Sequence, residues 1–102
     1  MDIQKAQRRS HRVRSRLHGT SQRPRASVHR SNKRMAVQLI DDDAQRTIAA
    51  ASGVDAKTLG EAIAARAKEA GVTYIVFDRG RYPYHGTVKT LAQTMRDGGL
   101  IF

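Results

Sequence analysis

The sequence predicts an α/β fold, a mixed sheet of about four strands with two core helices, preceded by a basic N-terminal helix or arm. Three observations predict it. Apolar residues alternate with a period of two between residues 25 and 51, and they return to helical spacing over 55–70 and again after residue 87. A short apolar run lies between those two helical segments. Because a helix between two strands of one sheet requires a crossover, we expect that run to be a strand parallel to an earlier one, joined right-handedly.

The first segment, residues 3–18, is expected to form a basic helix. Five basic residues recur at helical spacing and share one face: Lys5, Arg8, Arg9, Arg12 and Arg16. Gly19 is placed to end this helix, and Pro24 prevents its continuation. Like charges four residues apart repel, so we expect the helix to order fully only when phosphate groups neutralise the stripe. The expected organisation is a basic arm at residues 1–22 and one globular α/β domain at 23–102.

Residues 25–51 are expected to form an antiparallel meander. Ala26 and Val28 alternate with polar residues in a strand at 25–30, and a turn at 31–34 leads to a second strand at 35–40. Three consecutive aspartates at 41–43 predict the next turn, and 47–51 predicts a weaker third strand. Such short turns connect antiparallel neighbours.

The second half of the chain is expected to supply two helices and one strand. In the helix at 55–70, Thr58 and Glu61 could form a capping box and Gly71 ends the helix. Residues 73–77 are apolar on both alternating faces, which predicts a buried central strand. The helical face of 55–70 comprises Leu59, Ala62, Ile63, Ala67 and Ala70, and that of the last helix comprises Val88, Leu91, Ala92 and Met95. Gly98 and Gly99 close the last helix, and the apolar tail at 100–102 is expected to dock on the core.

The charge of the chain is concentrated at its N-terminal end. Residues 1–34 hold eleven Lys and Arg against one acidic residue, whereas the rest holds eight basic and eight acidic residues. This asymmetry is typical of a protein that binds a polyanion. The chain has no cysteine and no apolar run long enough for a signal peptide or a membrane span, so we expect a soluble cytosolic protein without membrane contact.

The loop at residues 79–86 is the second informative segment. It contains Tyr82 and Tyr84 beside Arg79, Arg81 and His85, although the whole chain has only five Tyr and Phe residues. Aromatic and guanidinium planes beside cationic donors suit unpaired or bulged RNA bases. The alternative is that the tyrosines pack on the sheet edge and the loop is a glycine-assisted turn.

Catalytic chemistry is not indicated. Asp41, Asp42, Asp43 and Asp78 could gather metal ions for phosphoryl transfer only if they converged, and a turn explains consecutive aspartates better. The four histidines include no pair at metal-binding spacing, and no phosphate-binding glycine loop or nucleophile elbow is present. We therefore expect no enzyme, no cofactor, no metal and no small-molecule substrate.

Three runs of sequence resemble a known family. They are Arg-Pro-Arg-Ala-Ser-Val-His-Arg-Ser-Asn-Lys at 23–33, Gln-Leu-Ile-Asp-Asp at 38–42, and Val-Phe-Asp-Arg-Gly-Arg-Tyr-Pro-Tyr-His-Gly at 76–86, followed by a helix that ends in Gly-Gly-Leu-Ile-Phe. Together they resemble the bacterial large-subunit ribosomal protein L-eighteen family, from about Arg8 to Phe102 in order. The connection at 52–55 is shorter than the family commonly has.

The resemblance implies a non-catalytic protein of the cytoplasmic ribosome. Such a protein binds 5S ribosomal RNA, helps to attach it to 23S ribosomal RNA in the central protuberance, and neighbours other large-subunit proteins. The residues expected to contact RNA are Lys5, Arg8, Arg9, Arg12, Arg14, Arg16, His18, Arg23, Arg25, Ser27, His29, Arg30, Ser31, Asn32, Lys33, Arg34, Arg79, Gly80, Arg81, Tyr82, Tyr84, His85, Gly86 and Lys89.

Two other classes of protein stay open on sequence alone. One is a DNA-binding, nucleoid-type module in which the step Arg23-Pro24-Arg25 imitates a minor-groove hook. The other is a small metal-dependent nuclease, which would require Asp41 and Asp78 to converge.

Overall fold

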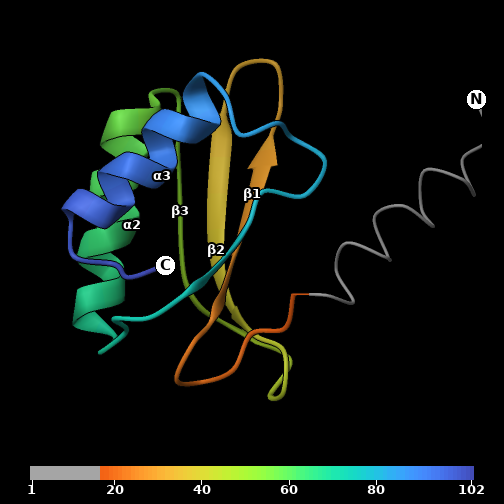
Figure 1. Cartoon of the computed structure of the whole chain (residues 1–102), viewed down its shortest axis with the longest axis vertical. Helices are drawn as coiled ribbons and strands as arrows, with labels where there is room; N and C mark the ends of the chain where they lie inside the picture. The colour runs from red at the N-terminus through yellow and green to blue at the C-terminus, as the bar shows by residue number, and fades with distance from the viewer. Residues whose placement is uncertain (1–16) are drawn as a thin grey trace, which may run out of the picture.

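The computed structural model describes residues 17–102. The helix predicted over 3–18 falls almost entirely outside that range, and the described residues 17–20 have no regular secondary structure. Along the described chain the elements are β1 (Arg25–Arg30), β2 (Met35–Asp41), β3 (Arg46–Gly53), α2 (Ala56–Glu69), β4 (Val76–Asp78) and α3 (Thr87–Asp97). Two helices cover one face of a four-stranded sheet (Figure 1), which confirms the predicted fold class.

The strands lie in the order β3-β2-β1-β4. β1 pairs antiparallel with β2, placing Arg25 opposite Ile40, and β2 pairs antiparallel with β3, so the predicted meander is confirmed. β4 is parallel to β1, with Val76 beside Arg25 and Asp78 beside Ser27. The crossover through α2 therefore returns the chain to the first strand of the meander.

β4 lies at the edge of the sheet, so the prediction of a buried central strand at 73–77 is wrong. Tyr74 is 48% exposed, whereas Ile75 is buried in the core. The second apolar face of this run is explained by the C-terminal tail, because the Phe77 and Phe102 rings stack 5.2 Å apart. The tail also extends the edge, since the Ile75 amide donates to the Ile101 carbonyl at 3.1 Å and the Ile101 amide donates to the carbonyl of residue 73 at 2.9 Å.

The turn between β2 and β3 occupies residues 42–45. The Asp41 carboxylate accepts hydrogen bonds from the amides of Asp43 and Ala44, and Gln45 has a φ of 53°. β3 extends beyond the predicted 47–51, because the long strand β2 supplies pairing partners from Arg46 to Gly53.

The helix α2 begins with a cap other than the predicted one. The Asp55 carboxylate accepts hydrogen bonds from the amide and the hydroxyl of Thr58, at 2.9 and 2.8 Å. The predicted capping box between Thr58 and Glu61 is therefore wrong, because the Thr58 amide donates its hydrogen bond to Asp55 and not to Glu61. At the other end Gly71 follows the helix with a φ of 76°, in the left-handed conformation that glycine tolerates best.

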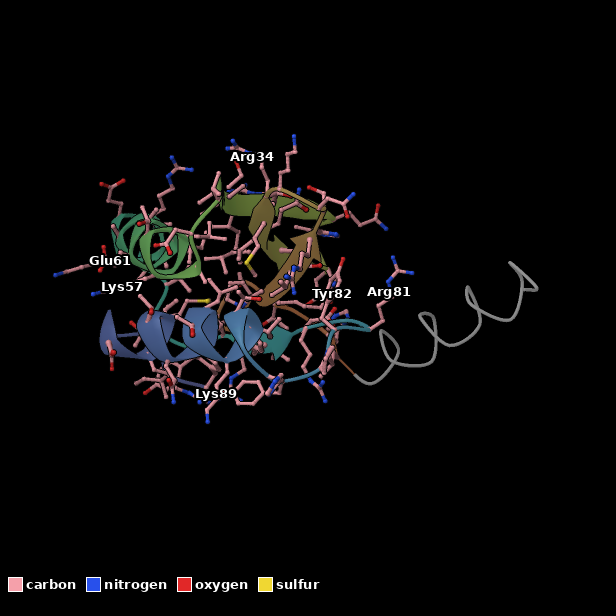
Figure 2. The ribbon with its side chains drawn as sticks, turned by 90° about the horizontal axis from the view of Figure 1, so that it is seen from above. Arg34, Lys57, Glu61, Arg81, Tyr82 and Lys89 are labelled. Carbon is pink, nitrogen blue, oxygen red and sulfur yellow. The ribbon has the colours of Figure 1, made fainter. Side chains whose placement is uncertain are left out.

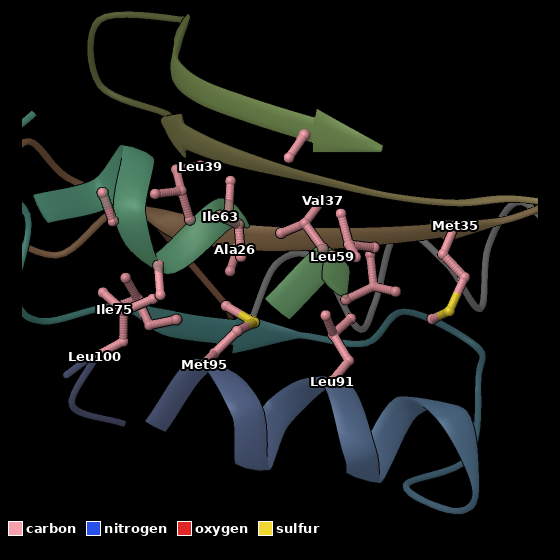
Figure 3. Packing of buried hydrophobic residues seen from close by; sticks show 14 of the residues in the cluster. Ala26, Met35, Val37, Leu39, Leu59, Ile63, Ile75, Leu91, Met95 and Leu100 are labelled. Carbon is pink, nitrogen blue, oxygen red and sulfur yellow. The ribbon is translucent and has the colours of Figure 1, made fainter. Parts of the chain in front are cut away.

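The hydrophobic core lies between the sheet and the two helices (Figure 3). Its largest fully buried members include Val37 and Leu39 from β2, Leu59 and Ile63 from α2, and Val88, Leu91 and Met95 from α3. Ile75 and Leu100 extend this core toward the tail, as Figure 3 shows. Between residues 17 and 102, neither helix is long and apolar enough to cross a membrane.

Candidate nucleic-acid interface

The tip of the β1–β2 hairpin presents a row of basic side chains. Arg30, Lys33 and Arg34 are exposed, as are Ser31 and Asn32 between them. The Ser31 amide donates to the Arg34 carbonyl at 2.8 Å, which closes the turn and directs the side chains outward. The Arg34 guanidinium reaches the Ser52 hydroxyl on β3 at 3.3 Å.

The loop at 79–86 is tied to this hairpin through Tyr82. The Tyr82 hydroxyl donates to the Arg30 carbonyl and accepts from the Arg30 amide, both at 3.0 Å. Because β4 pairs with β1 only as far as Ser27, the hydroxyl takes the place of a neighbouring strand at Arg30. The Arg79 guanidinium in turn donates to the Tyr82 carbonyl at 2.8 Å. The exposed arginines of the loop and those of the hairpin therefore belong to one connected surface.

The two loop tyrosines have different surroundings. Tyr82 is half-buried and packs against the core, which is the sheet-edge alternative left open by the sequence. Tyr84 is 40% exposed, and its hydroxyl accepts a 3.3 Å hydrogen bond from Arg96 on α3. Of these two rings, Tyr84 is the more exposed.

Arg25 has internal partners, although the sequence places it among the RNA contacts. Its Nε and Nη2 donate to the two carboxylate oxygens of Asp42 at 2.9 and 3.0 Å, and its Nη1 donates to Asp78 at 2.9 Å. The Arg25 side chain is 12% exposed and that of Asp78 is 3% exposed. The hydrogen bonds from Arg25 are the main cause of the lowered pKa of Asp42. Ser27 is also buried, and its hydroxyl is 3.2 Å from His29 Nε2.

The side chains of Arg25, Asp42 and Asp78 form a cluster, called here the Arg25 cluster, and the root of the basic arm, residues 17–20, is attached to it. The Gly19 amide donates to the Asp42 carboxylate at 2.7 Å, and the Asp42 amide donates to the Gly19 carbonyl at 2.9 Å. A Cβ on Gly19 would lie 2.3 Å from the Ile40 carbonyl oxygen, so only glycine fits this close approach. Sequence reasoning assigned Gly19 to a helix end and missed this contact.

His18 adds an exposed ion pair at the arm root. Its Nε2 is 2.6 Å from the Asp43 carboxylate. The hydrogen bond to Asp43 is the largest cause of the raised pKa of His18. The root of the arm is thus attached to the β2–β3 turn at two points, through Gly19 to Asp42 and through His18 to Asp43.

Further basic side chains lie on several sides of the molecule (Figure 2). Arg81 projects from the loop, away from Lys57 and Glu61 on α2, whereas Arg34 and Lys89 lie on opposite margins in that view. Arg23 is exposed, and its guanidinium lies 5.7 Å from the centre of the Tyr74 ring. His29, Gly80, His85 and Gly86 are exposed as well. The predicted contacts Lys5, Arg8, Arg9, Arg12, Arg14 and Arg16 lie outside the described residues.

The carboxylates have structural partners that account for their positions. Asp41 caps the β2–β3 turn. Asp78 accepts hydrogen bonds from the Arg25 guanidinium and, at 2.8 Å, from the Gly80 amide, and the second bond steadies the start of the following loop. Asp42, and not Asp41, faces Asp78 across the Arg25 guanidinium. Within the described chain, no three His, Asp or Glu side chains are grouped to hold a metal ion.

A minor-groove hook at 23–25 is not compatible with these contacts. A hook requires arginines that extend from the surface into a groove. Pro24 is fully buried, and the Arg25 guanidinium is held by two carboxylates. Arg23 alone is exposed in this step.

Comparison with known proteins gives consistent matches over the whole chain. The model of the family described as "Ribosomal L18 of archaea, bacteria, mitoch. and chloroplast" matches residues 2–102. The chain is 49% identical to large ribosomal subunit protein uL18 of Bacteroides thetaiotaomicron, with 90% of each chain covered, and the values for the Bacteroides fragilis protein are the same. It is 44% identical to the Listeria monocytogenes protein of that name, over 115 aligned positions that cover all of this chain and 97% of the relative. Since this chain has 102 residues, it is shorter than that relative within the matched region.

Proposed function

Because the chain belongs to the ribosomal L18 family, we propose that it binds 5S ribosomal RNA and helps to attach it to 23S ribosomal RNA in the central protuberance of the large subunit. Membership of this family makes the chain a structural, non-enzymatic constituent of the large ribosomal subunit, in the cytoplasmic ribosome. Its partners are accordingly ribosomal RNA and other ribosomal proteins, and the choice of 5S and 23S RNA belongs to the proposal.

The observation that carries the proposal is the connected basic surface made by the hairpin tip and the loop. Tyr82 holds the loop against Arg30, so the arginines of both segments keep fixed relative positions. A preorganised array of cations costs less ordering on binding than separate flexible ones. The six basic residues of the arm, between Lys5 and Arg16, would add phosphate contacts from the sequence that precedes the arm root.

The direct contacts that we propose are the exposed polar side chains around this surface and those of the arm. From the described chain they are His18, Arg23, His29, Arg30, Ser31, Asn32, Lys33, Arg34, Arg79, Arg81, Tyr84, His85 and Lys89, with backbone approach at Gly80 and Gly86. Arg25, Ser27 and Tyr82 have intramolecular partners and support these contacts from within.

The test is a comparison of affinities for 5S RNA, transfer RNA and duplex DNA at one fixed salt concentration. We expect 5S RNA to bind at least about 10-fold more tightly than the other two, and the logarithm of its binding constant to fall steeply with the logarithm of salt concentration. Equal affinity for all three would contradict the proposal, because it would reduce the surface to a nonspecific polycation.

Two matched variants locate the surface. Arg81→Ala should reduce the slope of log K against log salt by close to one unit, because a phosphate contact is lost. Lys57→Ala removes the same charge from α2, on the side away from Arg81, and should leave the slope unchanged. Equal effects of the two variants would show that binding responds only to net charge.

A further inference from the structure

The Arg25 cluster joins four segments of the chain: the arm root, β1, the β2–β3 turn and the end of β4. Asp42 belongs to the β2–β3 turn, and it holds both the Gly19 backbone and the Arg25 guanidinium. Asp78 ends β4, and it holds the same guanidinium with one carboxylate oxygen and the Gly80 amide with the other. The arm root and the first residues of the loop are therefore linked through three side chains in series, Asp42, Arg25 and Asp78.

The charges in the cluster oppose RNA binding. One guanidinium faces two carboxylates, so the cluster carries a net charge of about −1. A phosphate group that approached Arg25 would meet both carboxylates and would have to displace existing hydrogen bonds. Electrostatic attraction of RNA does not explain two carboxylates at this place.

We propose that Arg25 is a positioning residue that couples the arm root at Gly19 to the loop at 79–86, and that it supports RNA binding through this coupling instead of by contact with a phosphate group. The inference rests on the proposed function and concerns how the RNA-binding segments are held. A guanidinium can donate two parallel hydrogen bonds to one carboxylate and a third to another, which fixes the relative placement of the two carboxylates. Lysine carries the same charge but cannot reproduce this fork.

The proposal predicts a change in RNA affinity opposite in direction to the change expected from charge alone. Asp42→Asn removes a negative charge and should therefore strengthen RNA binding if only long-range electrostatics matters. If Arg25 acts by positioning, Asp42→Asn should weaken binding of 5S RNA by roughly 3- to 30-fold, the range typical of lost coupling within a network. Glu61→Gln is the matched control, since it also removes one negative charge, and Glu61 lies on α2, on the side away from Arg81.

Hydrogen exchange in the free protein tests the coupling separately from RNA. The Gly80 amide is bound to Asp78, and no direct hydrogen bond joins it to Asp42. We expect Asp42→Asn to speed exchange at Gly80 more than at Leu91, which is buried in the core on α3. A purely global loss of stability would speed exchange at both amides together.

The variant Arg25→Lys keeps the proposal testable if Asp42→Asn fails to fold. It preserves the charge and should still weaken RNA binding, with the salt slope unchanged and with faster exchange at Gly19 and Gly80. Wild-type affinity in Arg25→Lys, or equal or tighter binding in Asp42→Asn, would overturn the positioning role. Failure of the wild-type protein to prefer 5S RNA would instead contradict the proposed function, and the exchange at Gly80 would still decide whether the coupling exists.

Discussion

The Tyr82 hydroxyl offers the sharpest test of how the loop is held. The substitution Tyr82→Phe keeps the ring, which packs against the core, and removes only the oxygen that binds the Arg30 amide and carbonyl. No charge changes and no cavity opens. Any effect therefore reports the two hydrogen bonds between the loop and the end of β1.

The expected magnitude follows from the geometry of these bonds. Each hydrogen bond is 3.0 Å long and neutral, and such a bond contributes about 0.5 to 1.5 kcal/mol net. Arg30 is exposed, so water can replace part of what is lost, and a total near 1 kcal/mol is expected for the pair. For a domain of this size, that loss should lower the Tm by about 4 to 8 °C.

The assay combines thermal unfolding with RNA binding measured well below the Tm. We expect Tyr82→Phe to lower the Tm and to weaken 5S RNA binding only modestly, because the freed loop must be ordered on binding. The salt slope should not change, since no cation is removed. An unchanged Tm together with a loss of affinity of ~10-fold or more would refute the reasoning, because the hydroxyl would then contact RNA and not Arg30.

Four further outcomes are expected. Deletion of residues 1–16 removes six basic residues but keeps the arm root; with four or five of the six in contact with phosphates, the salt slope should fall by roughly 3 to 4, and an unchanged slope would exclude the arm from binding. Tyr84→Ala should cost about 1 to 3 kcal/mol of RNA affinity with little change in Tm if the exposed ring stacks on a base, whereas a lower Tm with full affinity would make it scaffold. Gly19→Ala should lower the Tm, because its Cβ would meet the Ile40 carbonyl at 2.3 Å, and a calorimetric Tm equal to that of the wild type would contradict this packing. Titration followed by NMR should give His18 a pKa above 6.5 that falls in Asp43→Ala; with a raised folded pKa, the contribution of the pair to stability is present below pH 6.5 and is lost as the pH rises through the folded pKa.

Much of the fold follows from local patterns in the sequence. The alternation of Ala26 and Val28 predicts β1 with its observed ends, and helical spacing predicts α2 and α3 to within a residue or two. The edge position of β4 could not be predicted in the same way. An apolar run faces two apolar environments either in a central strand or at an edge covered by a tail, and the pattern of residues 73–77 is the same in both cases.

The candidate site was harder to predict because exposure is not encoded in residue type. Arg23 and Arg25 are alike in the sequence, yet one is exposed and the other is held by two carboxylates. The nearness of Arg25 to Asp42 can be predicted from the sequence. A turn at 31–34 pairs Arg30 with Met35, so Arg25 lies opposite Ile40, two residues before Asp42. The contact with Asp78, 53 residues away, depends on the crossover and has no local signal. The division into an arm at 1–22 and a domain at 23–102, together with the direct RNA contacts, stays a prediction.

The parallel pairing of β1 with β4 also affects the order in which the molecule forms. The meander joins neighbouring segments, whereas Arg25 pairs with Val76, and Tyr74, just before β4, pairs with Ile101, each across a long stretch of chain. Contacts between residues so far apart form late, because the intervening chain must first be closed into a loop. During synthesis the edge of β1 therefore stays open until Val76–Asp78 has been made, and an open edge is prone to wrong pairing. The link between the arm root and the loop is completed only after Asp78 has been made, so the proposed RNA-binding surface takes its final shape after the meander has formed.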